Sequence, residues 1–403
     1  MSIAGDRQLS NEETRMGART QGGLNRREFL RAGGIGAATA VAAGGLLTGV
    51  RAASAAPQAL GLVGTDGHIT LPGPDGPREL YMFGFKRVPA GQSVTTVIND
   101  NKGHAQHCAP ILDFVQDDDV TITVTNAGLV GRPDLTDAHT LHWHGFRTPT
   151  ALMDGVPEVS IGVPIGRQFP YFFRPHDPGT YMYHCHFEDV EHVQMGMTGI
   201  VFVRPKGALK TVYGASDTAF DREFALLLNE LWTVMHDNDE NIQETVHTDY
   251  DPDYWTINGR VYPQTIAGND SSPQPVSALI QCNAGERVLL RLANLGYQQH
   301  AMQMPGVALK VVGQDATKLA APYTTHTLYI GPGEARDVLL TAPAHNPSRP
   351  SATDGANRYL FRNADASKLT NGGAPGLGGM ATEMRVYPAG TLPTQATPNQ
   401  TYV

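Results

Sequence analysis

The sequence of 403 residues has little charge, and its positive charge is nowhere concentrated. Charged residues make up 17% of the chain, the net charge is −9, and no basic cluster occurs in its body. Because nucleic-acid binding depends on concentrated positive charge, a nucleic acid is not an expected partner. Beyond the N-terminal segment no apolar run is long enough to cross a bilayer.

Cysteine is also scarce, with only Cys108, Cys185 and Cys282 present. An odd number leaves at least one thiol outside any disulfide. Cys185 lies directly between two histidines, which marks it as the functional thiol. Cys108 and Cys282 could pair or stay buried and free, and we favour free thiols.

The N-terminus has the features of a targeting segment. Arg26-Arg27 is followed by a Gly- and Ala-rich apolar run to about Val50 and then by the small-residue cleavage pattern Ala53-Ser54-Ala55. This pattern resembles a twin-arginine signal, which exports folded proteins. We expect residues 1–55 to be a signal peptide and the mature protein to be periplasmic, cell-surface or extracellular. The alternative is a membrane anchor, which the weak hydrophobicity of the run disfavours.

The abundant turn-forming residues, 44 Gly and 28 Pro, predict many short strands rather than long helices. The rest of the chain is a repeat, because residues 120–128 parallel residues 288–296, and Gly196-Met197 parallels Gly379-Met380. Both halves contain short alternating or β-branched runs between turns. We therefore predict an all-β protein with two tandem β-sandwich or barrel domains.

The repeat also sets the expected domain boundaries. We predict domain 1 at residues 56–205, a linker at 206–221, domain 2 at 222–390 and a polar tail at 391–403. Helix is expected to be scarce. Residues 224–235 contain strong helix formers, but their spacing also suits a strand.

Histidines gather in two short clusters on either side of residue 160. The first contains His139, His142 and His144, and the second contains His184, His186 and His192. Side chains alternate between the two faces of a strand, so His142 and His144 share one face. In the second cluster His184 and His186 likewise share a face, and Cys185 between them points to the other. One strand can therefore serve two metal sites.

The Cys185 side has the ligand set of a blue-copper electron-transfer site. Such a site combines a thiolate, two imidazoles and a weak axial thioether. The chain offers Cys185, His139, His192 and Met197 in these roles. The alternatives are structural or surface histidines, or zinc, but the compact paired ligands of structural zinc sites are absent.

Domain 1 resembles a cupredoxin domain of the multicopper oxidases. Besides the two clusters it contains Asp154-Gly155-Val156-Pro157 and residues 179–183, Gly-Thr-Tyr-Met-Tyr, before the second cluster. The resemblance implies two tandem cupredoxin-like Greek-key domains and a three-copper cluster that reduces O2 with electrons from the blue copper. The resemblance also implies four candidate ligands of this cluster, which are His142, His144, His184 and His186. It also makes candidate proton-relay carboxylates of Asp154 and Glu188.

A chain with two such domains is most similar to the small two-domain oxidases. The resemblance implies a homotrimer, with the three-copper cluster between domain 1 of one subunit and domain 2 of the next. Copper is then the cofactor, and the partners are O2 and a small-molecule or metal-ion reductant.

Domain 2 departs from this pattern. The family's cluster uses eight histidines, four from each domain, but in domain 2 only His300 aligns with the first cluster. The late segment reads Arg362-Asn363-Ala364 where the repeat suggests His-Cys-His. The alternatives are a cluster with fewer coppers, completion by His104, His107 or His300, or completion by a partner chain.

Three functions remain open from the sequence. The favoured one is oxidation of a phenolic, aromatic amine or metal-ion substrate at the blue copper, coupled to O2 reduction, with His192 near the substrate. The second is a blue-copper electron carrier without oxidase activity. The third is a copper nitrite reductase, because the spacing from Cys185 to His192 is two residues longer than is usual in laccases.

Overall fold

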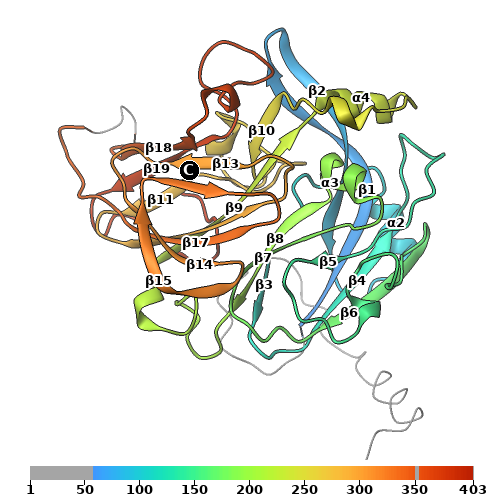
Figure 1. Cartoon of the computed structure of the whole chain (residues 1–403), viewed down its shortest axis with the longest axis horizontal. Coiled ribbons are helices and arrows are strands. Elements are labelled where there is room, and N and C mark those ends of the chain that lie inside the picture. The colour runs from blue at the N-terminus through green and yellow to red at the C-terminus, as the bar shows by residue number, and fades with distance from the viewer. Residues whose placement is uncertain (1–57, 350–353, 403) are drawn as a thin grey trace, which may run out of the picture. The chain divides into compact units, whose positions relative to one another are not determined.

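The computed structural model describes residues 58–349 and 354–402 (Figure 1). The predicted signal peptide lies outside these residues. The described residues form two β-sandwiches, with only three short α-helices. None of the helices in this part of the chain is both long and apolar enough to pass through a membrane. The all-β, two-domain cupredoxin-like fold expected from the sequence is therefore confirmed.

The first sandwich has two four-stranded sheets, in the orders β2-β1-β4-β6 and β3-β8-β7-β5. Alternation along β4 builds its core, because Val120, Ile122 and Val124 are all fully buried against the other sheet. The strands are β1 (Gln58–Gly73), β2 (Gly76–Val88), β3 (Leu112–Val115), β4 (Val120–Asn126), β5 (His142–Trp143), β6 (Arg167–Phe173), β7 (Gly179–His184) and β8 (Thr198–Arg204). The helices are α2 (Val94–Asn101), α3 (Asp189–Met195) and the single turn η1 (Ala151–Met153).

The second sandwich has a six-stranded sheet, β10-β9-β12-β17-β14-β15, and a five-stranded sheet, β11-β19-β18-β13-β16. Its strands are β9 (Arg222–Leu231), β10 (Tyr254–Ile257), β11 (Ile280–Asn283), β12 (Arg287–Asn294), β13 (His300–Gln303), β14 (Leu309–Gln314), β15 (Thr317–Thr325), β16 (Thr327–Ile330), β17 (Ala335–Thr341), β18 (Asn357–Asn363) and β19 (Ala381–Tyr387). Its helical turns are η2 (Ser216–Thr218), α4 (Thr233–Glu240), η3 (His247–Asp249), η4 (Gln264–Ile266) and η5 (Ala366–Lys368).

The two sandwiches repeat the same turn after equivalent strands. Asn126 at the end of β4 accepts a hydrogen bond from the backbone of Gly128, and Asn294 at the end of β12 accepts one from Gly296. In both domains this strand pairs in parallel with the first strand of its sheet, β1 or β9. The sequence repeat is thus a structural repeat.

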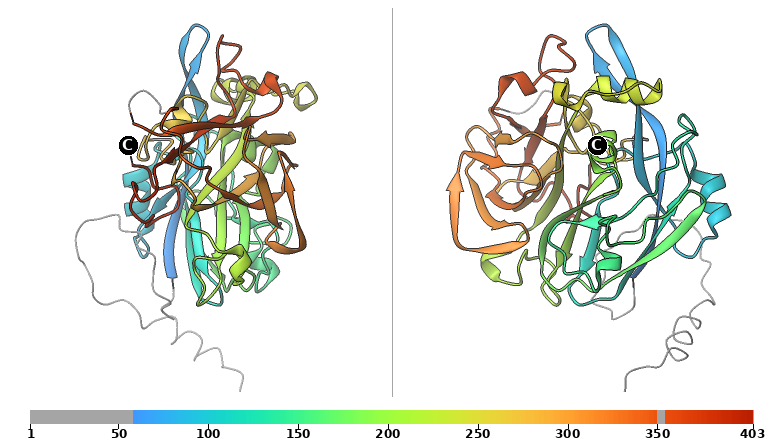
Figure 2. Two further views of the ribbon diagram at one scale, coloured as in Figure 1. Left: turned by 90° about the vertical axis from the view of Figure 1, so that its left-hand side faces the viewer. Right: turned by 45° about the vertical axis from the view of Figure 1, so that its right-hand side comes forward.

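The ambiguous segment 224–235 divides into a strand and a helix. Every residue of β9 is buried, because one of its faces packs in the second core and the other packs against the first sandwich. A strand covered on both faces has no polar alternation and can be read as a helix. The helix α4 that follows packs against β2, as Figure 2 shows for the yellow helix beside the blue hairpin.

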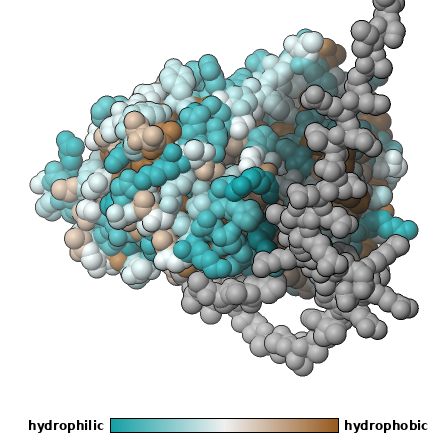
Figure 3. All heavy atoms as spheres, turned by 60° about the horizontal axis from the view of Figure 1, so that its bottom comes forward, coloured by the Kyte–Doolittle hydropathy of each residue, from teal (hydrophilic) through white to brown (hydrophobic). Residues whose placement is uncertain are grey.

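One face of the described residues is largely polar. On the face drawn in Figure 3, hydrophilic residues dominate and apolar residues form small scattered patches. All three cysteines are buried and free, so Cys108 and Cys282 do not form a disulfide.

A buried ionic network joins the two sandwiches. Arg291 on β12 is fully buried, and its guanidinium lies 3.4 Å from Asp337 Oδ1 on β17. Asp337 also accepts hydrogen bonds of 2.6 Å from Thr180 on β7 and from Tyr213. The guanidinium stacks on Phe202 of β8 at 4.3 Å. The network therefore ties β7, which leads into the second histidine cluster, to domain 2.

Asp337→Ala should lower the free energy of unfolding by about 3 kcal/mol, because it leaves the buried hydroxyls of Thr180 and Tyr213 without their acceptor and leaves Arg291 with Glu223 as its remaining ion-pair partner. Denaturant unfolding followed by circular dichroism measures the change. Asp217→Ala, which breaks an exposed pair with Lys318, is the control and should change stability little. Equal stability of the two variants would show that the network is not structural.

Candidate metal centres

Strand pairing brings the two histidine clusters together. His142 on β5 lies opposite His184 on β7, and His139 forms an isolated bridge with Val163. The strand β7 ends at His184, and Cys185 and His186 follow it directly. Successive side chains of such an extended segment point to alternate sides. Two separate groups of side chains result, one on each side.

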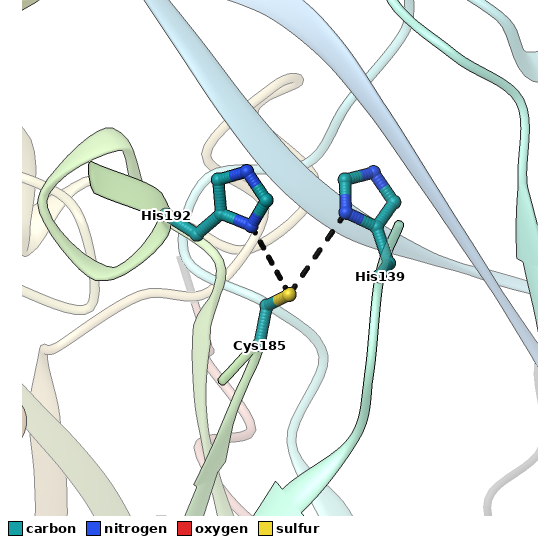
Figure 4. A group of neighbouring side chains, drawn as sticks. All are labelled: His139, Cys185 and His192. Carbon is teal, nitrogen blue, oxygen red and sulfur yellow. Dashed lines mark hydrogen bonds between the residues drawn. The ribbon is translucent and has the colours of Figure 1, made fainter. Parts of the chain in front are cut away.

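The first group contains Cys185, His139 and His192 (Figure 4). Both imidazoles turn Nδ1 toward the sulfur, with Sγ 3.1 Å from His192 Nδ1 and 3.9 Å from His139 Nδ1. All three residues are almost completely buried. A thiol and two ring nitrogens that converge in this way form a ready metal site.

Met197 lies beside this group, held by the backbone. Cys185 N–H donates to Met197 C=O at 3.2 Å, and Met197 N–H donates to His192 C=O at 2.9 Å. A Cβ at Gly64 of β1 would lie 3.2 Å from Met197 Cε and 2.5 Å from His139 Cδ2. Met197 and His139 therefore meet over Gly64, where only a glycine fits.

The electrostatics of this group favour a bound cation. Burial raises the pKa of Cys185 to about 11 and lowers the pKa of His139 to about 4. Burial also holds the pKa of His192 well below its usual value. Neutral imidazoles beside a thiol suit a metal, whose charge stabilises the thiolate. Two imidazoles, one thiolate and a nearby thioether fit copper.

The second group contains His142, His144 and His184, whose ligand atoms all lie within 4.8 Å of one another. The Nε2 atoms of His144 and His184 are only 3.0 Å apart. Burial lowers the pKa of each ring, and that of His184 falls to about 3. Neutral rings whose nitrogens converge can share a metal ion.

Two of these three rings are oriented by backbone carbonyls, and the third lies against a glycine. His142 Nδ1 donates to Asp154 C=O at 2.6 Å, and His184 Nδ1 donates to Cys185 C=O at 2.7 Å. The His144 ring packs against Gly333, where a Cβ would lie 3.5 Å from its Nδ1. Metal-binding histidines are commonly fixed through the nitrogen that does not bind the metal. His142 and His184 therefore present Nε2 to the common centre, and His144 Nε2 lies 3.0 Å from that of His184.

His186 is near the group but is not oriented in this way. Its ring lies 4.9 Å from that of His142 and 5.3 Å from that of His184. His186 Nδ1 is buried without a hydrogen bond, 3.9 Å from Asp189 Oδ2. The four rings named from the sequence thus lie together, and His186 differs from the others in that its Nδ1 has no hydrogen bond and that it is not part of the convergent group of three.

A pocket of about 490 Å³ opens beside these histidines. Asp154 lines it, with Oδ2 3.9 Å from His142 Nδ1. Glu188, the other carboxylate named from the sequence, is the N-cap residue of α3 and does not line this pocket, and burial together with the nearby charge of Asp137 raises its pKa. Asp315 and Gly333 of domain 2 also line the pocket. No sequence motif marks these two, because only the packing of the domains brings them here.

Domain 2 contains a copy of this framework without metal ligands. Gln303 lies opposite Arg362, as His142 lies opposite His184. Asn363 takes the place of Cys185, since its N–H donates to Met380 C=O at 3.0 Å.

Hydrogen bonds fill the place of a metal in this copy. Asn363 Nδ2 lies 3.2 Å from His300 Nδ1 and 3.5 Å from Met380 Sδ. His300 Nε2 lies 3.2 Å from Glu230 Oε2. Both nitrogens of His300 are therefore engaged inside domain 2, so this histidine does not complete the group in domain 1.

The remaining candidate histidines also lie apart from both groups. His107 is buried between Gly196 and Gly259, and His104 is exposed at the edge of a separate pocket with His68. Neither His104 nor His107 belongs to the two convergent groups of the described residues.

Comparison with known proteins agrees with this geometry. Two family models described as multicopper oxidase match residues 87–208 and residues 222–352, together more than half of the chain. The chain belongs to the multicopper oxidase family. Its His-Cys-His site of blue-copper type lies in the first of two cupredoxin domains.

Individual relatives place this multicopper oxidase near laccases. It is 30% identical to Laccase-3 of Oryza sativa subsp. japonica, over 70% of this chain and 47% of that protein. It spans about a third to a half of the length of the plant laccases it matches.

Solved structures share the fold. The blue copper oxidase from Nitrosomonas europaea is 26% identical with a TM-score of 0.63, over 82% of this chain and 86% of that one. A copper nitrite reductase from Nitrosomonas europaea is 16% identical with a TM-score of 0.55, over 86% and 97% of the two chains. At that identity the second likeness concerns the fold alone.

Gly64→Ala should shift or bleach the blue absorption of the copper-loaded oxidase, because the new methyl group displaces the His139 ring. Visible spectra of the two proteins at equal copper content measure the effect. Gly67→Ala on the same strand is the control, since its Cβ would meet only Ala105, at 3.3 Å or more. An unchanged spectrum in Gly64→Ala would contradict the placement of His139.

Proposed function

We propose that this multicopper oxidase takes single electrons from a reductant at a copper held by His139, Cys185, His192 and Met197 and passes them to O2 at copper on the His142, His144 and His184 group. The observation that carries the proposal is the direct link between the two groups. Cys185 belongs to the first and His184 to the second, and the C=O of Cys185 accepts the hydrogen bond that orients His184. Electrons therefore have a covalent path of two adjacent residues.

The residues of the first group have distinct roles. Copper, when bound, supplies the one-electron chemistry. His139, His192 and Cys185 hold it, and their burial keeps water away from it. On the acceptor side, Asp154 and Asp315 line the pocket and can hold protons close to where O2 is reduced.

The surroundings of His192 support a cationic reductant among the three classes considered. Glu191, Asp239 and Asp137 each have a buried carboxylate oxygen without a hydrogen bond. Burial raises the pKa of Glu191 to about 8 and that of Asp239 to about 6, and neighbouring carboxylates add to the effect on Glu191. Arg132 is the cation whose charge acts on Asp239 and Glu191. A metal ion placed here would stabilise these carboxylates in their charged form, whereas a neutral phenol, or an aromatic amine that is uncharged near neutral pH, would not.

Glu191→Gln should raise KM for a metal-ion reductant such as Fe(II) roughly fivefold, equivalent to about 1 kcal/mol, and leave KM for a neutral phenol unchanged. Steady-state kinetics with both substrates measure this difference. The blue spectrum must stay unchanged, which shows that the adjacent His192 still binds copper. Asp75→Asn, at the exposed β1–β2 turn, is the charge control. Equal effects on both substrates would remove the support for a cationic reductant.

We also propose that the protein is exported by the twin-arginine pathway and works as a homotrimer. The export proposal rests on the Arg26-Arg27 segment, and the trimer on similarity to two-domain oxidases. The size of the exported protein tests both proposals: a chain shortened by the signal peptide supports export, and a native mass of three chains supports the trimer.

Nitrite reduction is a second candidate. It needs one electron and a copper with three imidazoles, which the His142, His144 and His184 group can hold. It differs from the first candidate only in the acceptor, and the electron donor side is the same.

Cys185→Ser and His144→Ala test the proposed function. Cys185→Ser should abolish both the blue absorption and the consumption of O2, with the fold intact by circular dichroism. His144→Ala should keep the blue absorption and stop O2 consumption. Wild-type protein that reduces nitrite and leaves O2 untouched would identify the second candidate. Wild-type protein that is blue and reduces neither acceptor would be an electron carrier.

A further inference from the structure

We propose that the second metal centre is a single copper ion held by His142, His144 and His184, and that the oxidase therefore reduces O2 to hydrogen peroxide rather than to water. The part of this inference that concerns the product of O2 reduction rests on the proposed function, whereas the number of coppers does not. The residues of this chain do not fit a three-copper cluster.

The first step concerns what domain 2 can contribute. By the register of β13 with β18, the positions equivalent to His142 and His184 are Gln303 and Arg362. The positions equivalent to His144 and His186 are Pro305 and Ala364, by the same alignment. None of these side chains is an imidazole. A neighbouring copy of the chain presents the same four residues, so assembly into a trimer adds no histidine at these positions.

The one aligned histidine of domain 2 is not available. His300 is nearly fully buried, and both of its ring nitrogens already have partners, Asn363 and Glu230. Glu230 is itself fixed by the backbone of Gln298 at 2.8 Å and by the hydroxyl of Tyr250 at 3.1 Å. Moving His300 to another face would break this buried set of hydrogen bonds, which is costly.

The second step concerns what domain 1 can hold. Four rings on this face can supply the ligands of one copper, but not the eight histidines of a three-copper cluster. The Nδ1 atoms of His142 and His184 are engaged by backbone carbonyls, and the Nε2 atoms of His144 and His184 lie 3.0 Å apart, so the ligand atoms of these three rings converge. The chain therefore prepares one site with three ligands.

The chain's own domain 2 contributes to this site. Gly333 lies against the His144 ring, and a Cβ at Gly333 would be 3.4 Å from that ring. Asp315 lines the same pocket. One side of the histidine group is thus closed by the same chain, without a second subunit.

The electron balance follows from the copper count. If each centre held one copper, the protein would store two electrons, taken from two molecules of a one-electron reductant. Two electrons and two protons convert O2 to H2O2, with the O–O bond kept. Cleavage of that bond to give two waters needs four electrons, twice the number that two coppers would store.

Copper analysis of the full-length, reconstituted protein tests the count. The protein is loaded with excess Cu(II), freed of loosely bound metal by gel filtration, and measured for copper per chain and for unpaired spins per copper. We expect two coppers per chain, all visible by electron paramagnetic resonance. Three or four coppers, or a fraction of copper without a spin signal, indicates a coupled cluster and overturns the proposal.

Matched variants place the second copper. His144→Ala should reduce the count from two to one and remove the signal that is not blue. His186→Ala should keep both coppers, since this ring is not one of the three convergent ligands. Loss of copper in His186→Ala and not in His144→Ala overturns the ligand assignment. Circular dichroism confirms that both variants are folded.

The product is tested separately with an oxygen electrode and a peroxide assay. We expect two electrons taken from the reductant for each O2 consumed and one H2O2 formed. Four electrons for each O2, without peroxide, overturns the two-electron reaction. If the protein holds two coppers and consumes no O2, the proposed oxidase function fails, whereas the single-copper site is upheld by the metal count.

Discussion

Both metal centres depend on the alternation of side chains at the end of β7. His184 and Cys185 are neighbours in sequence, yet a strand directs them to opposite sides, so each joins a different group. The same backbone then connects the groups, through the hydrogen bond from His184 Nδ1 to the C=O of Cys185. Any change that moved this strand by one residue would exchange the two faces and destroy both sites at once.

The strand is held in place by domain 2. Thr180 on β7 donates to Asp337, which is paired with the buried Arg291. Gly333 of domain 2 packs against the His144 ring. Domain 2 has thus kept a structural role at the acceptor centre although its equivalent positions lack metal ligands.

The two domains have the same backbone framework, but only domain 1 has the metal-binding side chains. The backbone hydrogen bond from Cys185 to Met197 is repeated from Asn363 to Met380. Where one domain has a thiol, the other has an amide that lies within hydrogen-bonding distance of the equivalent histidine and methionine. The sandwich is stable with either set, because a buried polar group needs a partner but not a particular one.

The sequence by itself determined the two β domains, the Cys185 group and the four histidines, because alternation along a strand and ligand chemistry are local properties. It also showed that domain 2 lacks most ligands. Only the tertiary structure decided that His186 Nδ1 is buried without a hydrogen bond, that His300 is engaged by Glu230 and Asn363, and that Gly64 leaves room for His139. These depend on contacts between residues far apart in the chain, for which neither spacing nor composition carries a signal.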